Sequence, residues 1–242
     1  MYETLKCVVL RTIKYDDRRS IVTAWSAERG RVSLLVPAGA SREARRRRAL
    51  MMPLGLFEGE VDLRPGRELL SIRDVRPLKV LPDLCCNPAK AVVAMFLSEV
   101  LERSLRDTAP DALLTQYIFD AVELLDKLSR PVGVANFPLV FLYKLGRFLG
   151  IEPDTGTWSP GYVFDMQGGL FRRTAPTVGR WIEADEAEFV MLLDRMTFAA
   201  SERLGISRAR RRRALEVVLE YYTLHHAPLS ELKSLPVVQE IF

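Results

Sequence analysis

The side chains best suited to chemistry in this chain are arginines, and their densest run follows a predicted β-strand. Residues 31–36 alternate polar and apolar positions, and Pro37, Gly39 and Ser41 end the strand. The next residues predict a loop or a frayed helix that carries Arg42 and Arg45–Arg48. An uncompensated guanidinium is too costly to bury, so most of these side chains must face water or an anion. A phosphate chain is the anion that suits them best.

A run of arginines can also be no more than a solvated surface. Its position favours nucleic-acid binding, because small oligonucleotide-binding barrels place basic loops between strands beside their binding face. The distribution of charge agrees. Residues 1–80 hold 17 Lys and Arg against 10 Asp and Glu, a net charge of +7, whereas residues 81–242 hold 18 against 21, a net charge of −3. The positive field therefore belongs to the first third of the chain.

Sequence motifs of the common catalytic classes are absent: there is no glycine-rich phosphate loop, no nucleophile elbow and no His-Glu-x-x-His. The two histidines, His225 and His226, end a predicted helix, where pairing with terminal carbonyls or covering a packing edge explains them better than catalysis. Asp16 and Asp17 lie between basic residues, which favours local charge pairing. We expect no catalytic residue and no enzyme activity.

The cysteines Cys7, Cys85 and Cys86 have neither the spacing of a disulfide framework nor that of a tetrahedral zinc site. We expect them to be packing thiols and expect no metal or other cofactor. The chain opens without a secretory signal and has no apolar run near the roughly 20 residues that cross a bilayer. It is therefore expected to be cytoplasmic, without a membrane partner.

The first third of the chain reads as a series of short strands. Gly30 supplies the positive φ that a hairpin connection needs, and Pro53, Gly55 and Gly59 suit a bent strand at a barrel corner. The predicted strands are residues 5–13, 21–25, 31–36, 51–61 and 69–75. Five strands in about 80 residues predict a barrel of the oligonucleotide-binding type, although SH3-like barrels share this pattern.

Helical periodicity replaces the strand pattern from Pro82 onward. Asn87 and Pro88 predict a helix start, and Ser207 predicts the cap of the last long helix. The predicted helices are residues 88–106, 111–128, one from 136–138 to 150, 185–195 with a possible extension to 204, and 208–224, with a small hairpin in the insert 150–180. The fold class is therefore α+β: a barrel domain, residues 1–80, and a helical domain, residues 81–242.

The last helix opens with Arg208 and Arg210–Arg213, which oppose the positive N-terminal end of its own dipole. Either acidic side chains between Asp185 and Asp194 or a bound phosphate could compensate them. We favour the acidic side chains.

The order of these elements resembles the RecO family of bacterial recombination mediators. The resemblance rests on VVLRTIKYDDRRSIVTAWSAERGRVSLLVPAGAS near the start, ELLSIRDVRPL closing the barrel, the helical remainder, and LSELKSLPVV at the end. It spans nearly the full length. It implies an oligonucleotide-binding fold (OB-fold), binding of single- and double-stranded DNA, strand annealing, and recombinase loading in recombinational repair. It also implies partnership with RecR and with the C-terminal tail of single-strand-binding protein, and a cytoplasmic, nucleoid-associated location.

Residue roles follow from this resemblance. The DNA-binding residues, matched to the basic barrel surface of the family, are Lys14, Arg18, Arg19, Arg31, Arg42, Arg45, Arg46, Arg47 and Arg48. Tyr15, Trp25 and Phe57 could stack on bases, although core packing is the favoured role of each. The single-strand-binding-protein tail is acidic and apolar, so a groove rimmed by cations would suit it, and the residues that fit are Phe141, Lys144, Arg147 and Phe148. An ordinary amphipathic helix explains these four slightly better.

Many members of the family carry a four-cysteine zinc element after the third helix, where this chain has GIEPDTGTWSPGYVFDMQGGLFRRTAPTVG without cysteine. We therefore expect no zinc, and expect Trp158, Tyr162, Phe164 and Phe171 to hold the insert by packing.

Two other classes of function stay open. A barrel scaffold whose arginines bind an acidic protein would hold no DNA at physiological salt. An enzyme whose site is assembled from distant residues would show a polar pocket with displaced carboxylate pKa values.

Overall fold

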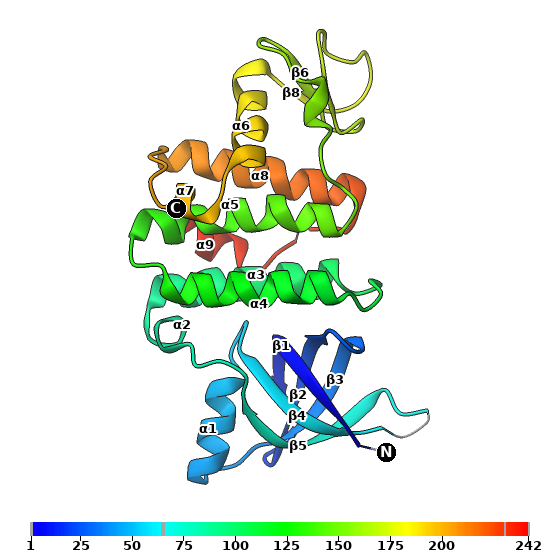
Figure 1. The fold of residues 1–242 in the computed structure, drawn as a ribbon, viewed down its shortest axis with the longest axis vertical. Helices are drawn as coiled ribbons and strands as arrows, with labels where there is room; N and C mark the ends of the chain where they lie inside the picture. The colour runs from blue at the N-terminus through cyan, green and yellow to red at the C-terminus, as the bar shows by residue number, and fades with distance from the viewer. Residues whose placement is uncertain (1, 64–65, 230, 242) are drawn as a thin grey trace. The chain divides into compact units, whose positions relative to one another are not determined.

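A computed structural model describes residues 2–63, 66–229 and 231–241, and the chain divides into two compact units, Met1–Lys127 and Leu128–Phe242 (Figure 1). The first unit contains the strands of a barrel and the helices that follow it. The second contains further helices and a small sheet. No helix within the described ranges is both long and apolar enough to cross a membrane.

The barrel of the first unit closes in the order β1-β2-β3-β5-β4. Neighbouring strands are antiparallel except β3 and β5, which run parallel over a short stretch. The strands are β1 (Tyr2–Lys14), β2 (Arg19–Ser26), β3 (Gly30–Pro37), β4 (Leu56–Asp62) and β5 (Leu69–Pro77). The predicted barrel of five strands, with its oligonucleotide-binding type of architecture, is confirmed for the part of the chain that the structure describes.

The fourth strand begins later than predicted. Residues 51–55 are a turn in which Leu54 has a φ of 60°. A Cβ at Gly55 would lie 2.0 Å from the carbonyl oxygen of Leu50, so only glycine allows the chain to fold back so closely. The glycine expected inside a bent strand therefore forms the turn before it.

Alternate residues of the strands fill the barrel, as the two-residue period of a strand requires. The buried core includes Leu5, Cys7, Val22, Leu34 and Phe57. The outer face of β1 packs against α3 (Pro88–Ser104). The indole of Trp25 is fully buried and donates a 2.8 Å hydrogen bond to the hydroxyl of Thr115, in α4 (Ala112–Lys127).

Helices α2 (Pro82–Cys86), α3 and α4 thus belong to the same compact unit as the barrel. Asn87 caps α3 as predicted, its side chain accepting from the main-chain N–H groups of Ala89 and Lys90. The compact units divide after Lys127, not at the predicted boundary after residue 80. Separate barrel and helical domains with that boundary stay a prediction.

The second unit starts with α5, which begins at Pro131 and not near Asn136–Pro138 as predicted. Asn136 is no cap: its side-chain amide is buried and donates to the carbonyls of Ser201 and Leu204 at 2.8 and 2.9 Å. Pro131 occupies the first helical position, where its missing N–H costs nothing. The remaining elements of this unit are α5 (Pro131–Phe148), α6 (Ala184–Arg195), α7 (Phe198–Ser201), α8 (Arg208–His225) and α9 (Leu235–Ile241).

The helix predicted over residues 185–195 is α6, which begins at Ala184 with Glu183 as its N-cap residue. The chain leaves the helix at Met196, so the longer alternative to residue 204 does not form. Ser207 caps α8 as predicted, accepting from the N–H of Arg210.

The insert contains the short helix η1 (Thr155–Thr157) and strands β6 (Val163–Asp165), β7 (Leu170–Arg172) and β8 (Trp181–Ile182). β6 and β7 form the predicted hairpin. Phe164 and Phe171 are buried with ring centroids 4.9 Å apart, whereas Trp158 and Tyr162 are half-buried. Across the described part of the chain, no three His, Cys, Asp or Glu side chains gather where they could hold a metal ion.

Candidate nucleic-acid interface

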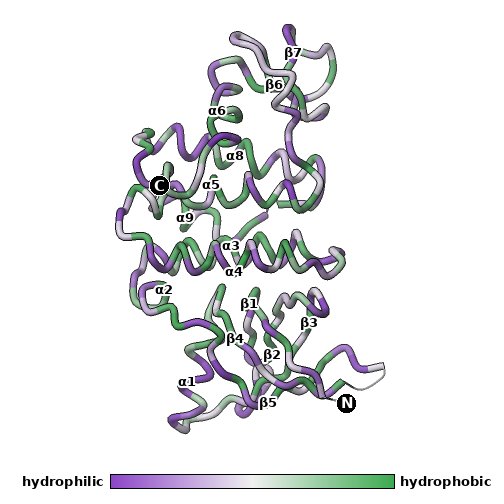
Figure 2. Tube along the Cα trace, viewed as in Figure 1, coloured by the Kyte–Doolittle hydropathy of each residue, from purple (hydrophilic) through white to green (hydrophobic). Residues whose placement is uncertain are grey.

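The predicted basic segment is a helix, α1 (Arg42–Leu50), so of the two predicted forms the loop is wrong. The hydroxyl of Ser41 accepts a 3.0 Å hydrogen bond from the N–H of Ala44, which caps the first turn. Glu43 lies at the positive end of the helix dipole, and Arg47 and Arg48 lie at the negative end. These local signals outweigh the repulsion among neighbouring arginines. Figure 2 shows the resulting hydrophilic helix.

The arginines of α1 fall into two groups. Arg47 is half-buried, pairs with Glu43 and donates to the carbonyl of Pro37, and Arg48 donates to the carbonyl of Gly39. These contacts anchor the helix to the end of β3. The second group comprises Arg42, Arg45 and Arg46, which are exposed and have no ion pair within residues 2–63, 66–229 and 231–241. Their guanidinium groups are available to an anion.

The turn between β1 and β2 carries the next predicted cations. Asp16 accepts from the side chain of Arg19 and from the main-chain N–H of Arg18, each at 2.8 Å, and the hydrogen bond from Arg19 is the main cause that lowers the pKa of the Asp16 carboxyl. Lys14 pairs with Asp17 at 2.7 Å. The predicted local charge pairing is confirmed. Within the described residues, the exposed side chain of Arg18 has no such pair.

Two main-chain contacts bring this turn beside α1. The N–H of Ala38 donates to the carbonyl of Arg18 at 2.7 Å, and Arg19 lies opposite Pro37 in the β2–β3 register. The two segments joined by these contacts carry the exposed side chains of Arg18, Arg42, Arg45 and Arg46, which we call the basic edge. Lys14, Arg19, Arg47 and Arg48 flank it with their charges already paired or bonded.

Arg31 lies apart from this edge. It is half-buried near the start of β3, opposite Trp25, and six residues of extended strand separate it from Pro37, about 20 Å. Its Nε atom is buried without a hydrogen-bond partner among the described residues. The structure therefore does not bring Arg31 together with the other predicted DNA-binding residues.

The predicted stacking residues differ sharply in exposure. Trp25 and Phe57 are completely buried, so they serve the core, as favoured. Tyr15 is 55% exposed beside the basic edge, and the guanidinium of Arg19 lies 5.2 Å from its ring centroid. Of these three aromatic residues, Tyr15 is the one that a base can reach.

The three cysteines differ in exposure. Cys7 is buried in the barrel, and burial raises the pKa of its thiol, which fits the predicted packing role. Cys85 and Cys86 are exposed at the end of α2, so that prediction is wrong for them. The sulfur of Cys85 lies 3.1 Å from that of Met52. A five-residue helix is too short to cover both side chains.

The second arginine run, at the start of α8, has structural partners. Arg213 forms a two-point ion pair with Glu186 at 2.7 and 3.0 Å, which confirms compensation by the acidic residues of α6. Arg208 and Arg212 donate to the carbonyl of Gln239 in α9, and Arg211 is buried against Asn136. These contacts fasten the start of α8 to three other elements. His225 ends the same helix, bonded to the carbonyl of Met166 at 2.7 Å, which agrees with its predicted packing role.

The residues predicted to bind the protein tail lie along α5. Phe141 is buried, and Lys144 is half-buried, where desolvation lowers the pKa of its ammonium. Arg147 pairs with Glu152 and lies 3.3 Å from Asp194. Phe148 is 37% exposed. A partner site on these four side chains therefore stays a prediction.

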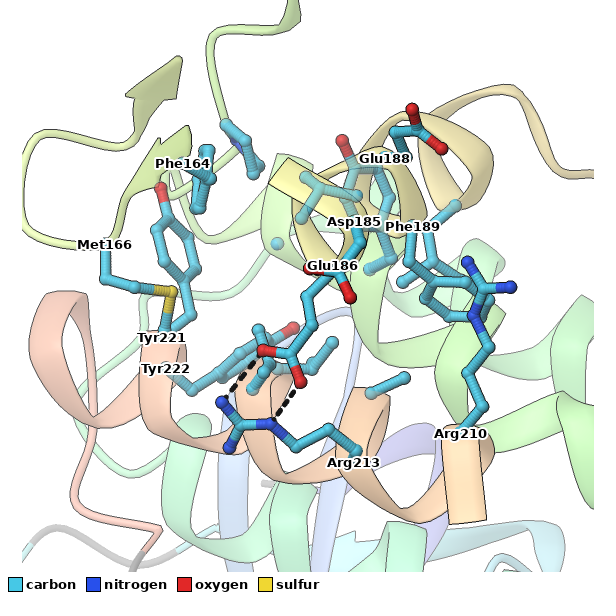
Figure 3. Close-up of a pocket in the computed structure, with 18 of the residues that line it drawn as sticks. Phe164, Met166, Asp185, Glu186, Glu188, Phe189, Arg210, Arg213, Tyr221 and Tyr222 are labelled. Carbon is cyan, nitrogen blue, oxygen red and sulfur yellow. Dashed lines mark hydrogen bonds and ion pairs between the residues drawn. The ribbon is translucent and has the colours of Figure 1, made fainter. Parts of the chain in front are cut away.

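An apolar cavity of about 640 Å³ lies elsewhere in the second unit, between α6, α8 and β6, and we call it the α6–α8 cavity (Figure 3). Phe164, Phe189 and Tyr221 line it. Arg210, whose guanidinium lies 5.4 Å from the Phe189 ring centroid, and the Glu186–Arg213 pair stand at its edge. Sequence reasoning missed this cavity, because its lining comes from helices whose apolar stripes look like ordinary core positions.

Comparisons with known proteins decide the family. The family model described as Recombination protein O N terminal matches residues 1–81, and that described as Recombination protein O C terminal matches residues 87–236. The chain belongs to the RecO family. DNA repair protein RecO of Phocaeicola vulgatus is 36% identical over 238 residues, covering 97% of each chain. The Bacteroides fragilis RecO protein is 35% identical over 236 residues, with 97% of each chain covered.

A more distant relative, DNA repair protein RecO of Porphyromonas gingivalis, is 31% identical over 242 residues and 98% of each chain. The resemblance inferred from the sequence is thus confirmed over the full length. Membership of the RecO family supports a role in DNA repair and recombination.

Proposed function

We propose that this RecO family protein binds single- and double-stranded DNA through the basic edge and promotes annealing of complementary strands in recombinational repair. The observation that carries the proposal is the group formed by Arg18 on one turn and Arg42, Arg45 and Arg46 on α1. These exposed cations have no ion pair among the described residues and border a barrel of the oligonucleotide-binding type. A location in the cytoplasm, at the nucleoid, follows from this role.

Annealing requires no covalent chemistry. Two complementary strands repel each other through their phosphates, and a cationic surface that replaces condensed counterions lowers this repulsion. The arginines bind backbone oxygens and carry no sequence information, so the bases stay free to pair. The exposed ring of Tyr15 can hold a base without restricting its neighbours. This arrangement suits a protein that brings strands together and then lets them pair.

We expect the flanking cations to contribute less to DNA binding than the basic edge does. Lys14 and Arg19 already pair with Asp17 and Asp16, although exposed pairs of this kind are worth only about 0–1 kcal/mol and can be exchanged for phosphate contacts. Arg47 and Arg48 support α1 itself. For Arg31 we propose only an indirect role, through the pairing of β3 with β2 opposite Trp25.

The test is equilibrium binding of fluorescent oligonucleotides across a salt series. We expect affinity to fall steeply with salt, and expect a triple variant to lose about 2 to 3 from the slope of log affinity against log salt for duplex DNA. This variant carries Arg42→Gln, Arg45→Gln and Arg46→Gln. A matched control removes the same charge from exposed positions of the second unit, with Arg173→Gln, Arg195→Gln and Arg203→Gln. A flat salt response of the wild type would overturn the proposal.

The partners implied by the family are RecR, the recombinase loaded indirectly, and the tail of single-strand-binding protein. For the tail we propose the α6–α8 cavity in place of the four α5 residues. Its interior is apolar, and the exposed guanidinium of Arg210 is the group that would pair with a tail carboxylate, since Arg213 is already paired with Glu186 and Asp185 and Glu188 also line the cavity. A synthetic acidic, apolar tail peptide tests this choice. Binding should weaken with Arg210→Ala and persist with Lys144→Ala. The opposite pattern would return the site to α5.

The competing proposal is a scaffold whose basic edge binds an acidic protein. It predicts no retention on DNA at physiological salt for the wild type and the control variant alike.

A further inference from the structure

A groove of about 570 Å³ lies on the barrel between α1 and β5. One wall carries Pro37, Glu43 and Arg47, and the other is formed by residues 72–76 of β5. Arg47 therefore reaches from the helix of the basic edge into the groove. Sequence reasoning assigned no function to the β5 wall.

A β-bulge shapes this wall. Glu58 lies opposite Arg76 and Glu60 lies opposite Arg73, so Asp74 and its neighbour Val75 together face a single residue of β4. Asp74 has a φ of 51°, a conformation that non-glycine residues seldom adopt. Bulges of this kind turn side chains in new directions and are frequent beside functional sites.

The residue of β4 opposite the bulge is Gly59. A Cβ there would lie 2.7 Å from Cδ1 of Ile72 and 3.1 Å from the carbonyl oxygen of Arg73. Glycine thus allows β5 to approach β4 closely and hold its bulge. The wall of the groove is built into the barrel.

The backbone of this wall is a poor template for a peptide strand. The described pairing of β5 with β3 covers only Leu69 to Ser71, which leaves the edge beyond Ser71 to another strand. The bulge at Asp74 interrupts that edge, and bulges protect sheet edges from such pairing. Side chains, more than main-chain groups, are therefore what this groove presents to a partner.

The cationic side chains that β5 presents to the groove are held by weak ion pairs. Arg73 lies 2.8 Å from Glu60, and Arg76 lies 3.5 Å from Glu58. Both arginine side chains stay more than half exposed, at 54% and 68%, so phosphate can replace these carboxylates at little cost. The ring of Tyr2 lies 3.7 Å beneath the guanidinium of Arg73 and fixes its plane.

We propose that the phosphate backbone of a DNA strand continues from the basic edge into this groove, where Arg73 and Arg76 bind its oxygens. We propose further that Glu43 and Asp74, in the same groove, limit the affinity so that annealed DNA is released. This inference rests on the proposed function and adds a second stretch of DNA path to it. Glu58 and Glu60, which pair with Arg76 and Arg73, bring the carboxylates to four beside three guanidinium groups, so phosphate must displace carboxylates in order to bind, which suits transient binding.

The test neutralises the two groove acids with Glu43→Gln and Asp74→Asn. Asparagine tolerates the positive φ of residue 74, so the bulge should persist. We expect affinity for a single-stranded oligonucleotide to rise roughly three- to tenfold at low salt and its dissociation to slow, because each removed carboxylate no longer repels a nearby phosphate. A control that neutralises the exposed acids Asp107 and Glu188, which lie outside the groove, should change affinity by less than twofold.

A second variant, Arg73→Gln with Arg76→Gln, should lower the affinity and reduce the salt slope by about 1.4 for single strands. If the wild type binds DNA and loses affinity with the basic-edge variant, while both groove variants behave like the control, only the groove inference is overturned. If the wild type binds no DNA at low salt, the proposed function and the groove inference fail together. Circular dichroism of each variant confirms that the barrel is folded.

Discussion

The main-chain N–H of Ala38 donates to the carbonyl oxygen of Arg18 at 2.7 Å, and this bond ties the turn after β1 to the segment that leads into α1. It joins two cation-bearing segments that are 20 positions apart in the sequence. The basic edge therefore depends on the fold of the barrel as much as on the number of its arginines.

The cap of α1 offers a test of that dependence without a change of charge. Ser41→Ala removes the acceptor for the N–H of Ala44 and should cost about 1 kcal/mol of local helix stability. We expect faster hydrogen exchange at the first amides of α1 and a modest loss of DNA affinity. Ser41→Asn, which can still cap, should retain both properties. Unchanged exchange in the alanine variant would mean that packing alone holds the helix.

The turn before β4 should tolerate no side chain at Gly55. Gly55→Ala places a Cβ 2.0 Å from the Leu50 carbonyl oxygen, so either the turn must open or the barrel must lose its closure. A loss of several degrees in Tm or failure to fold is the expected outcome. Gly205→Ala is the matched control, because its Cβ would meet open space. Equal stability of the two variants would contradict the described turn.

Variants of Trp25 and Tyr15 should distinguish a role in core packing from a role in DNA contact. Trp25→Phe leaves the buried hydroxyl of Thr115 without its indole donor, at a cost of about 1–3 kcal/mol in unfolding free energy. It should leave DNA affinity of the folded protein unchanged. Tyr15→Ala should do the reverse, with stability kept and affinity for single strands reduced by about 1–3 kcal/mol if its exposed ring stacks on a base. Denaturant unfolding and oligonucleotide binding of each variant measure the two effects.

The sequence predicts those features of the structure that depend on hydrogen bonds between residues close together in the sequence. The caps at Asn87 and Ser207 are local hydrogen bonds, and both are where their residue types indicate. Asn136 has the residue type of a cap, yet its amide joins carbonyls more than 60 positions away, which no local pattern reveals. The same limit applies to the site: the arginines were identifiable, but the bond that joins Arg18 to Ala38 and the groove beside β5 arise only from strand pairing.

The hairpin of the insert should weaken in acid. Burial raises the pKa of the Asp165 carboxyl, but hydrogen bonds from the Gly168 N–H, the Arg172 guanidinium and the Gln167 N–H outweigh it and lower the pKa below its ordinary value. Because the pKa is lower in the folded state, the ionised carboxylate stabilises the hairpin at every pH above the unfolded pKa, about 3.9. This stabilisation is lost as the pH falls through the pKa of the folded state.

Hydrogen exchange at the amides of Gln167 and Gly168 between pH 6 and 3, compared with Asp165→Asn, checks this prediction. These amides should exchange faster in the variant than in the wild type, and the opening of its hairpin should depend little on pH. A metal chelator should leave the wild-type hairpin unchanged, since we expect packing and this carboxylate, and no zinc, to hold it. Loss of protection on chelation would contradict that account.

The most direct test of the central claim is the annealing rate of two complementary labelled oligonucleotides, measured with and without the protein across a salt series. The wild type and the control lacking Arg173, Arg195 and Arg203 should both accelerate annealing, and the acceleration should fade with salt. The variant with glutamine in place of Arg42, Arg45 and Arg46 should anneal no faster than the oligonucleotides alone. If that variant accelerated annealing as well as the wild type, the basic edge would not be the annealing surface.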